Sequence, residues 1–267
     1  MTDFAQKKSY NFQDLVRIVA LLRAPDGCPW DREQTHASIQ MNFIEETYEV
    51  VDAIQQNDAH LLCEELGDVL LQVALHAQLE AETCAFTIDD VADGICKKLI
   101  YRHPHVFGTT VAETTKEVLQ NWEKLKIAEK HRESVGDNMD SVPRAMPALM
   151  RAAKVQKRAA GTKLEYQDAF GALADLQSEV AELAAALQVN DKDAAASELG
   201  DVLLSAVNVS RFIKCNAEQR LTASTDRFAA RVKAMDALAA QQGKTLSDIN
   251  EEELDKMWKE AKKVASK

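Results

Sequence analysis

The sequence predicts an all-α protein made of two tandem, duplicated helical-bundle domains. Ala, Leu, Glu, Lys and Gln are abundant, whereas only 9 Gly and 5 Pro interrupt the 267 residues, and this composition favours helix over sheet. Apolar residues recur at helical spacing. The seven-residue string Glu-Leu-Gly-Asp-Val-Leu-Leu occurs at 65–71 and again at 198–204. Such a repeat, present twice, indicates a duplicated domain.

The repeat extends beyond this string. At a fixed offset of 133 residues, positions 46–71 align without a gap with positions 179–204. Turn-forming Asn-Asp pairs, at 57–58 and 190–191, divide each segment in two. Each segment is therefore expected to be a helical hairpin with antiparallel neighbours. A polar stretch separates the repeats, and we place the domains at 1–135 and 136–267.

Charge and cysteine content narrow the class of protein. A formal net charge of −11 argues against nucleic acid or an anionic membrane as a partner. The five cysteines include no Cys-x-x-Cys pair, which is typical of a reducing compartment. The N-terminus has no apolar signal core, and no apolar run reaches the roughly 18 residues of a membrane span. We expect a cytoplasmic protein.

Four carboxylates with the same spacing in each hairpin are the candidate metal ligands. The three-residue spacing of each Glu-x-x-Glu and Glu-x-x-Asp pair puts both acids on one helix face. Carboxylates gathered between helices repel one another unless a cation lies among them, and an all-oxygen site favours Mg²⁺, with Mn²⁺ as the alternative. The predicted ligands are Glu46, Glu49, Glu65 and Asp68 in the first half and Glu179, Glu182, Glu198 and Asp201 in the second.

A glycine accompanies the acids in both hairpins. Gly67 and Gly200 lie in the middle of apolar helices, where glycine costs about 1 kcal/mol relative to alanine. We expect a close approach of two helices to account for glycine at both positions.

A pair of cations one helical turn apart follows each acidic quartet. Isolated pairs of this kind are usually surface charges, but the recurrence after both quartets indicates phosphate binding beside the metal. The two pairs are Lys98 with Arg102 and Arg227 with Arg231. Further on, Trp122 and Trp258 are each followed by a lysine one turn later, and these tryptophans could serve either the core or base stacking.

Seven strings resemble the MazG family of all-α nucleoside triphosphate pyrophosphohydrolases, over nearly the whole chain. They are GCPWDREQTH, EETYEV, EELGDVLL, YRHPHVFG, NWEKLK, PALMRAAKVQKR and MWKEAKK. The resemblance implies a homodimer of tandem helical bundles. It also implies Mg²⁺-dependent hydrolysis of nucleoside triphosphates to monophosphate and pyrophosphate. Tolerance of many bases, and a role in nucleotide-pool house-cleaning or stress, would follow.

The resemblance also implies roles for individual residues. Lys126, Arg227, Arg231 and Trp258 match positions that bind phosphate or base in the family, and the two quartets match its metal ligands. It favours the second half as the catalytic one. Within that half, Glu179 or Glu182 is the candidate general base.

The second half departs from the family pattern beside these residues. Ser178 and Ser197 stand where the first half has Glu45 and Glu64, so the more complete motif lies in the first half. Glu165-Tyr166 stands where the family usually has Asp-Trp, which affects the expected packing of the base. Which half is catalytic, or whether both are, stays open.

Three other interpretations remain at this point. A non-enzymatic metal-binding helical adaptor would use the duplicated bundles as a scaffold. A relative of narrower specificity would act on dUTP and dCTP or on phosphoribosyl-ATP. A di-iron carboxylate bundle needs two Glu-x-x-His motifs, and the chain has one, Glu33-x-x-His36, outside the repeat.

Overall fold

The computed structural model describes residues 4–129, 134–160, 162 and 164–264, and the chain divides into two compact units, 1–130 and 131–267. Every regular element in these described ranges is a helix, so the predicted all-α fold is confirmed. The position of the domain boundary between residues 135 and 136 stays a prediction. None of the described helices has the length and apolar composition needed to cross a membrane.

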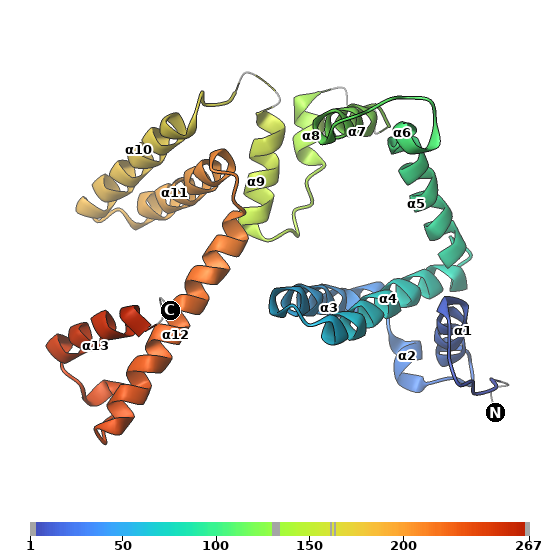
Figure 1. Cartoon of the computed structure of the whole chain (residues 1–267), viewed down its shortest axis with the longest axis horizontal. Helices are drawn as coiled ribbons and strands as arrows, with labels where there is room; N and C mark the ends of the chain where they lie inside the picture. The colour runs from blue at the N-terminus through green and yellow to red at the C-terminus, as the bar shows by residue number, and fades with distance from the viewer. Residues whose placement is uncertain (1–3, 130–133, 161, 163, 265–267) are drawn as a thin grey trace. The chain divides into compact units, whose positions relative to one another are not determined.

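Each unit contains one long antiparallel hairpin, α3–α4 or α10–α11 (Figure 1). The helices of the first unit are α1 (Phe12–Arg23), α2 (Pro29–Glu33), α3 (His36–Gln56), α4 (Ala59–Glu82), α5 (Ile88–Arg102), α6 (Pro104–Phe107) and α7 (Thr115–Glu129). Those of the second are α8 (Val135–Asp140), α9 (Ala148–Ala159), α10 (Ala169–Gln188), α11 (Lys192–Phe212), α12 (Ala217–Gln241) and α13 (Glu251–Val264), with a 3₁₀ turn η1 (Leu246–Asp248).

The Asn-Asp pairs make the hairpin turns, as the sequence predicts. Asn57 has a left-handed backbone with φ 55°, and its counterpart Asn190 has φ 56°. Asparagine adopts this conformation more readily than most residues. The carboxylate of Asp58 then accepts hydrogen bonds from the first turn of α4, and that of Asp191 does the same for α11. The same turn chemistry therefore reverses the chain in both halves.

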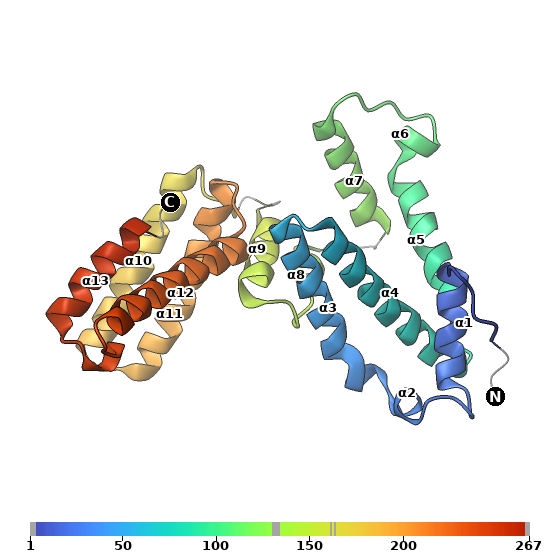
Figure 2. The ribbon, with the colours of Figure 1, turned by 60° about the horizontal axis from the view of Figure 1, so that its bottom comes forward.

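One small apolar cluster holds α1 to the first hairpin, and another joins α12 to α13. In the first unit, α1 packs on α4, as Figure 2 shows, and Val19, Ile39, Ala74 and Leu75 are buried together. In the second unit, the largest cluster of this kind lies between α12 and α13, around Ala239, Met257 and Ala261. Much of the apolar surface of the hairpins themselves stays exposed.

The predicted close approach of two helices at Gly67 and Gly200 is wrong within one chain. A Cβ atom added to Gly67 or Gly200 would meet nothing within 4 Å. Neither glycine is required by the packing of its own hairpin.

The αL turn gives a direct test of local stability. Replacing Asn57 with Val places a β-branched residue at positive φ, which should cost about 1–2 kcal/mol of folding free energy. Asn57→Gly has no Cβ to strain and should match or exceed the wild type. Thermal unfolding followed by circular dichroism compares the two. Equal melting temperatures for both variants would contradict the strain argument.

Candidate active site

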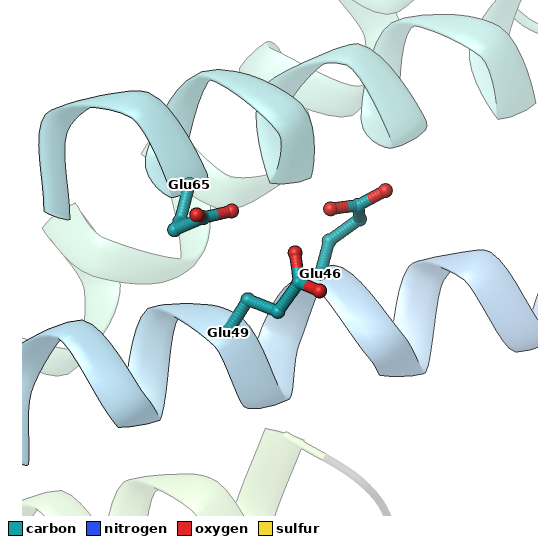
Figure 3. A group of neighbouring side chains, drawn as sticks. All are labelled: Glu46, Glu49 and Glu65. Atoms are coloured by element: carbon teal, nitrogen blue, oxygen red, sulfur yellow. The ribbon is translucent and has the colours of Figure 1, made fainter. Parts of the chain in front are cut away.

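Three glutamates converge between α3 and α4 in the first unit. Glu46 and Glu49 project from α3, and Glu65 projects from α4 toward them (Figure 3). One carboxylate oxygen from each lies within 4.8 Å of the others. The one-face spacing on each helix and the antiparallel packing of the hairpin together produce this convergence.

The second unit repeats this arrangement. Glu179 and Glu182 from α10 and Glu198 from α11 also have one oxygen each within 4.8 Å of the others. The pattern of exposure is the same in both units, with the middle glutamate of the three exposed and the outer two half-buried. The duplication therefore preserves the geometry of the cluster as well as its sequence.

The fourth acid of each predicted quartet lies outside these groups of three, but its charge raises the pKa of their glutamates. The charge of Asp68 raises the pKa of both Glu46 and Glu65. The charge of Asp201 raises the pKa of Glu179. Each quartet is thus three converging carboxylates with a fourth close enough to be felt electrostatically.

Mutual repulsion is the main electrostatic feature of both clusters. Loss of hydration is the largest cause of the raised pKa of Glu46, Glu65 and Glu179, and neighbouring carboxylates come next. Every charged group that contributes to these three shifts is itself a carboxylate. A divalent cation among the oxygens would relieve the repulsion, and an all-oxygen donor set suits Mg²⁺ or Mn²⁺. The residues therefore fit the implied metal.

Asp175 is a fifth acid that the sequence reasoning missed. It lies on α10 one turn before Glu179 and raises the pKa of that residue. Ser205 donates a hydrogen bond to it (Oγ to Oδ2, 2.7 Å), and the Tyr166 hydroxyl bonds to it as well, which raises the pKa of Tyr166. Its counterpart in the first half is Asn42, so the alignment of the repeats concealed it. Its spacing of four residues from Glu179, which puts both acids on one face of α10, is the sequence feature that indicates it.

Each half also places two cations over the ring of a tryptophan. In the first unit, Arg102 and Lys126 lie over the ring of Trp122, at 5.4 Å and 4.8 Å from its centroid. In the second, Arg231 and Lys262 lie over Trp258, at 5.6 Å and 5.9 Å. Both tryptophans are half-buried. The second cation of each pair, Arg102 or Arg231, thus forms one structural element with the tryptophan that follows it in the sequence.

The two arginines of these elements differ in their partners. Arg102 is buried and forms an ion pair with Glu129 (Nη2 to Oε2, 2.6 Å). Within the described residues, the Nε atom of Arg231 is buried and has no hydrogen-bond partner. Of the remaining candidates, Arg227 is exposed and donates to Ser224, and Lys98 is half-buried on α5.

The glutamate clusters and the arginine–tryptophan elements occupy different parts of each unit. In Figure 1, α5 leads away from the α3–α4 hairpin, and α12 leads away from α10–α11. Among the described residues, no cation contributes to the pKa shifts of Glu46, Glu65 or Glu179. The structure brings the members of each group together, and it does not bring the two groups together within a unit.

Comparison with known proteins decides the family. A family model described as the MazG nucleotide pyrophosphohydrolase domain matches residues 34–107 and 169–234, which contain the two hairpins. The nucleoside triphosphate pyrophosphohydrolase/pyrophosphatase MazG of Thermotoga maritima is 39% identical over 251 residues, covering 94% of this chain and 95% of the relative. The chain belongs to the MazG family.

Other relatives agree with this assignment. The nucleoside triphosphate pyrophosphohydrolase of Escherichia coli K12 is 36% identical over 252 residues, with 93% of this chain and 96% of the relative covered. Protein YabN of Bacillus subtilis, described as uncharacterized, is 41% identical over 96% of this chain, which spans 52% of that longer relative. The predicted family, the hydrolase class and the tandem arrangement of two MazG domains are confirmed.

The carboxylate repulsion predicts how stability depends on pH without metal. Glu179 has a raised pKa in the folded chain, so the folded state binds its proton more tightly than the unfolded state does. Stability is therefore lost as pH rises through this pKa. In EDTA, Glu179→Gln should melt above the wild type at pH 7, and the difference should shrink toward pH 4.5.

Thermal scans at both pH values test this dependence. Glu260→Gln, which removes an exposed acid on α13, is the matched control and should not change the melting temperature. A wild-type protein that melts above Glu179→Gln at pH 7 in EDTA would show that the cluster is not under electrostatic strain.

Proposed function

We propose that this MazG-family enzyme hydrolyses nucleoside triphosphates of varied base to nucleoside monophosphate and pyrophosphate, using Mg²⁺. The observation that carries the proposal is the pair of three-glutamate clusters, each with one oxygen per residue within 4.8 Å. Relatives of nearly the same length are described as nucleoside triphosphate pyrophosphohydrolases, which supports the same reaction here.

The second-half cluster supplies metal ligands and a proton acceptor. Glu179, Glu182, Glu198 and Asp201 would hold Mg²⁺, or Mn²⁺. The ion supplies charge neutralisation at the triphosphate oxygens and polarisation of a bound water. Glu179 is the first candidate to accept the proton of the attacking water. Glu182 is exposed and hydrogen-bonded to Ser178, and it is the alternative base.

Cations and one ring would hold the rest of the nucleotide. Arg227 and Arg231 would bind phosphate oxygens in the second unit, and Lys126 would do so in the first; guanidinium groups suit this task because they donate in pairs. Trp258 would stack on the base. Every base has a π-face, so stacking alone discriminates weakly and accounts for broad base tolerance.

The unequal arginines support the second half as the catalytic one. A phosphate that binds Arg102 must first displace Glu129, and this breaks an existing ion pair. Among the residues that the structure describes, Nε of Arg231 has no hydrogen-bond partner that a phosphate would have to displace. In the first half, Glu46, Glu49, Glu65 and Asp68 would still bind metal, and Lys98 and Arg102 would bind phosphate only after that exchange.

The exposed apolar surface supports a homodimer. The chain exposes 19089 Å², whereas two separate compact domains of half its mass would expose about 14,000 Å². Apolar stripes on the hairpins account for part of the excess, among them Ile44, Tyr48, Leu66 and Leu70 in the first and Val180, Leu187, Leu199 and Leu203 in the second. A second copy packed on these stripes would cover them, and Gly67 and Gly200 leave room for its helices.

The cellular setting completes the proposal. A chain of net charge −11 with no Cys-x-x-Cys pair suits the cytoplasm, where nucleoside triphosphates are made and used. Broad base tolerance suits removal of unwanted nucleotides from the pool during growth or stress.

Pyrophosphate release from a panel of NTPs and dNTPs, with and without Mg²⁺, tests the reaction. The wild type should release pyrophosphate only with the metal. Glu182→Ala should lower the rate by at least about 100-fold, because it removes a ligand and a candidate base. Glu49→Ala, the same change in the first half, should leave most activity. Glu260→Ala on α13 is the control.

The outcomes of this panel separate the alternatives. Loss in Glu49→Ala instead would assign catalysis to the first half. Orthophosphate in place of pyrophosphate would mean cleavage of a different bond. Activity confined to dUTP and dCTP or to phosphoribosyl-ATP would indicate the narrower relative, and no release from any nucleotide would favour the adaptor.

The homodimer is tested by mass in solution. Light scattering after gel filtration should give about twice the chain mass of 29.6 kDa. Leu203→Glu places a charge in the exposed stripe of α11 and should shift the protein toward the single-chain mass. A wild-type mass equal to one chain would contradict the proposed assembly.

A further inference from the structure

Two histidines and a glutamate join the start of α3 to the second half of α4. His36 is the first residue of α3, and His76 and Glu80 lie one turn apart on α4. The Nδ1 atoms of His36 and His76 are 2.7 Å apart, and Nε2 of His36 is 2.7 Å from Oε1 of Glu80. The two imidazole rings are nearly parallel, with centroids 5.0 Å apart. None of these side chains belongs to the glutamate cluster of the first unit.

The second half of the chain shows that a hairpin folds without this cluster. At the same offset of 133 residues, the counterparts of the three polar residues are Ala169, Val209 and Ile213. α10 begins at Ala169 just as α3 begins at His36, so the helix starts at the equivalent position in both halves. Packing of the hairpin therefore does not account for two imidazoles and a carboxylate at these positions.

The hydrogen bonds of His36 and His76 determine which ring nitrogen can offer a lone pair to a metal ion. An ionised carboxylate only accepts, so Nε2 of His36 must donate its N–H to Glu80. The two Nδ1 atoms then share a single proton, since one must donate and the other accept. Burial, and next the charge of His36, lower the pKa of His76 and so favour its neutral form, which is the form that binds metals.

We propose that His36 and His76 bind a divalent transition metal ion through their Nδ1 atoms, with Glu80 as the residue that orients His36. A tetrahedral ion with metal–nitrogen bonds of about 2.0–2.1 Å holds two nitrogens about 3.3 Å apart. The 2.7 Å separation must open by about 0.6 Å and the rings must tilt for the ion to take the place of the shared proton, which moves to Nε2 of His76 so that both imidazoles stay neutral. The side chain of His36 is 48% exposed, so water can complete the coordination.

The chemistry of this site differs from that of the glutamate clusters. A metal-bound histidine commonly donates its other ring N–H to a carboxylate, as His36 does to Glu80. Imidazole ligands suit Zn²⁺, Cu²⁺ and Ni²⁺, whereas carboxylate oxygens suit Mg²⁺ and Mn²⁺. The first unit would thus carry two kinds of metal site, and this inference holds whether or not the proposed reaction does.

Zinc titration of the metal-free full chain tests the site. Calorimetry is carried out in excess Mg²⁺, which fills the glutamate clusters. The wild type should bind one Zn²⁺ per chain, and the double variant His36→Ala/His76→Val should bind it at least about tenfold more weakly. These substitutions are the residues that the second half carries, so the helical fold should survive, as far-UV circular dichroism will verify.

A matched control uses the other histidine pair of this unit. The rings of His103 and His105 are 5.6 Å apart, and His103→Ala/His105→Ala should keep the wild-type zinc affinity. Weak or absent zinc binding in the wild type would overturn the proposal. Equal binding by the wild type and His36→Ala/His76→Val, or loss in the His103/His105 variant instead, would overturn it too.

Glu80→Gln separates the orienting role from folding. Both imidazoles remain in this variant, yet His36 loses its charged acceptor, so zinc affinity should fall about tenfold with the stoichiometry unchanged. Should the double histidine variant lose helicity, this variant decides the matter, and an unchanged zinc affinity would overturn the proposal.

Discussion

Repulsion among carboxylates at the interface of two helices is the constraint on which the site depends. Each hairpin directs three glutamates into one small space and adds an aspartate whose charge reaches them. The folded chain tolerates this because the middle glutamate stays exposed and the others are only half-buried. Apolar contacts and capped turns stabilise the hairpin and offset the repulsion among the carboxylates. Binding a divalent cation then turns an unfavourable arrangement into a favourable one.

Because the domain is duplicated, equivalent positions in the two halves can be compared directly. The turns at Asn57 and Asn190, the glutamate clusters and the tryptophans with two cations over the ring recur in both halves. The differences between the halves are local and involve polar side chains. The first half has the ion pair of Arg102 with Glu129 and the histidine pair of α3 and α4. The second half has the hydrogen bond from Ser205 to Asp175.

Much of the fold could be predicted from the sequence because it depends on local rules. Helical periodicity and the Asn-Asp pairs predict the hairpins, and the spacing of Glu46, Glu49 and Glu65 predicts their convergence. The ion pair of Arg102 with Glu129 and the bond from Ser205 to Asp175 join different helices. Such pairings depend on how helices pack, which no spacing along one chain specifies. For the same reason, it could not be predicted from the sequence that a Cβ atom at Gly67 would meet no atom within 4 Å.

Joining two hairpins in one chain fixes their stoichiometry. The cell always makes them in equal numbers, and the connecting segment holds them at an effective concentration that separate proteins would rarely reach. A hairpin with a lost catalytic group would therefore still be present wherever its neighbour works, provided that its turn and its apolar face are kept. Selection can then act on the chemistry of one half while the other changes its ligands. The exchange of Ala169, Val209 and Ile213 for two histidines and a glutamate is the kind of divergence that such a linkage permits.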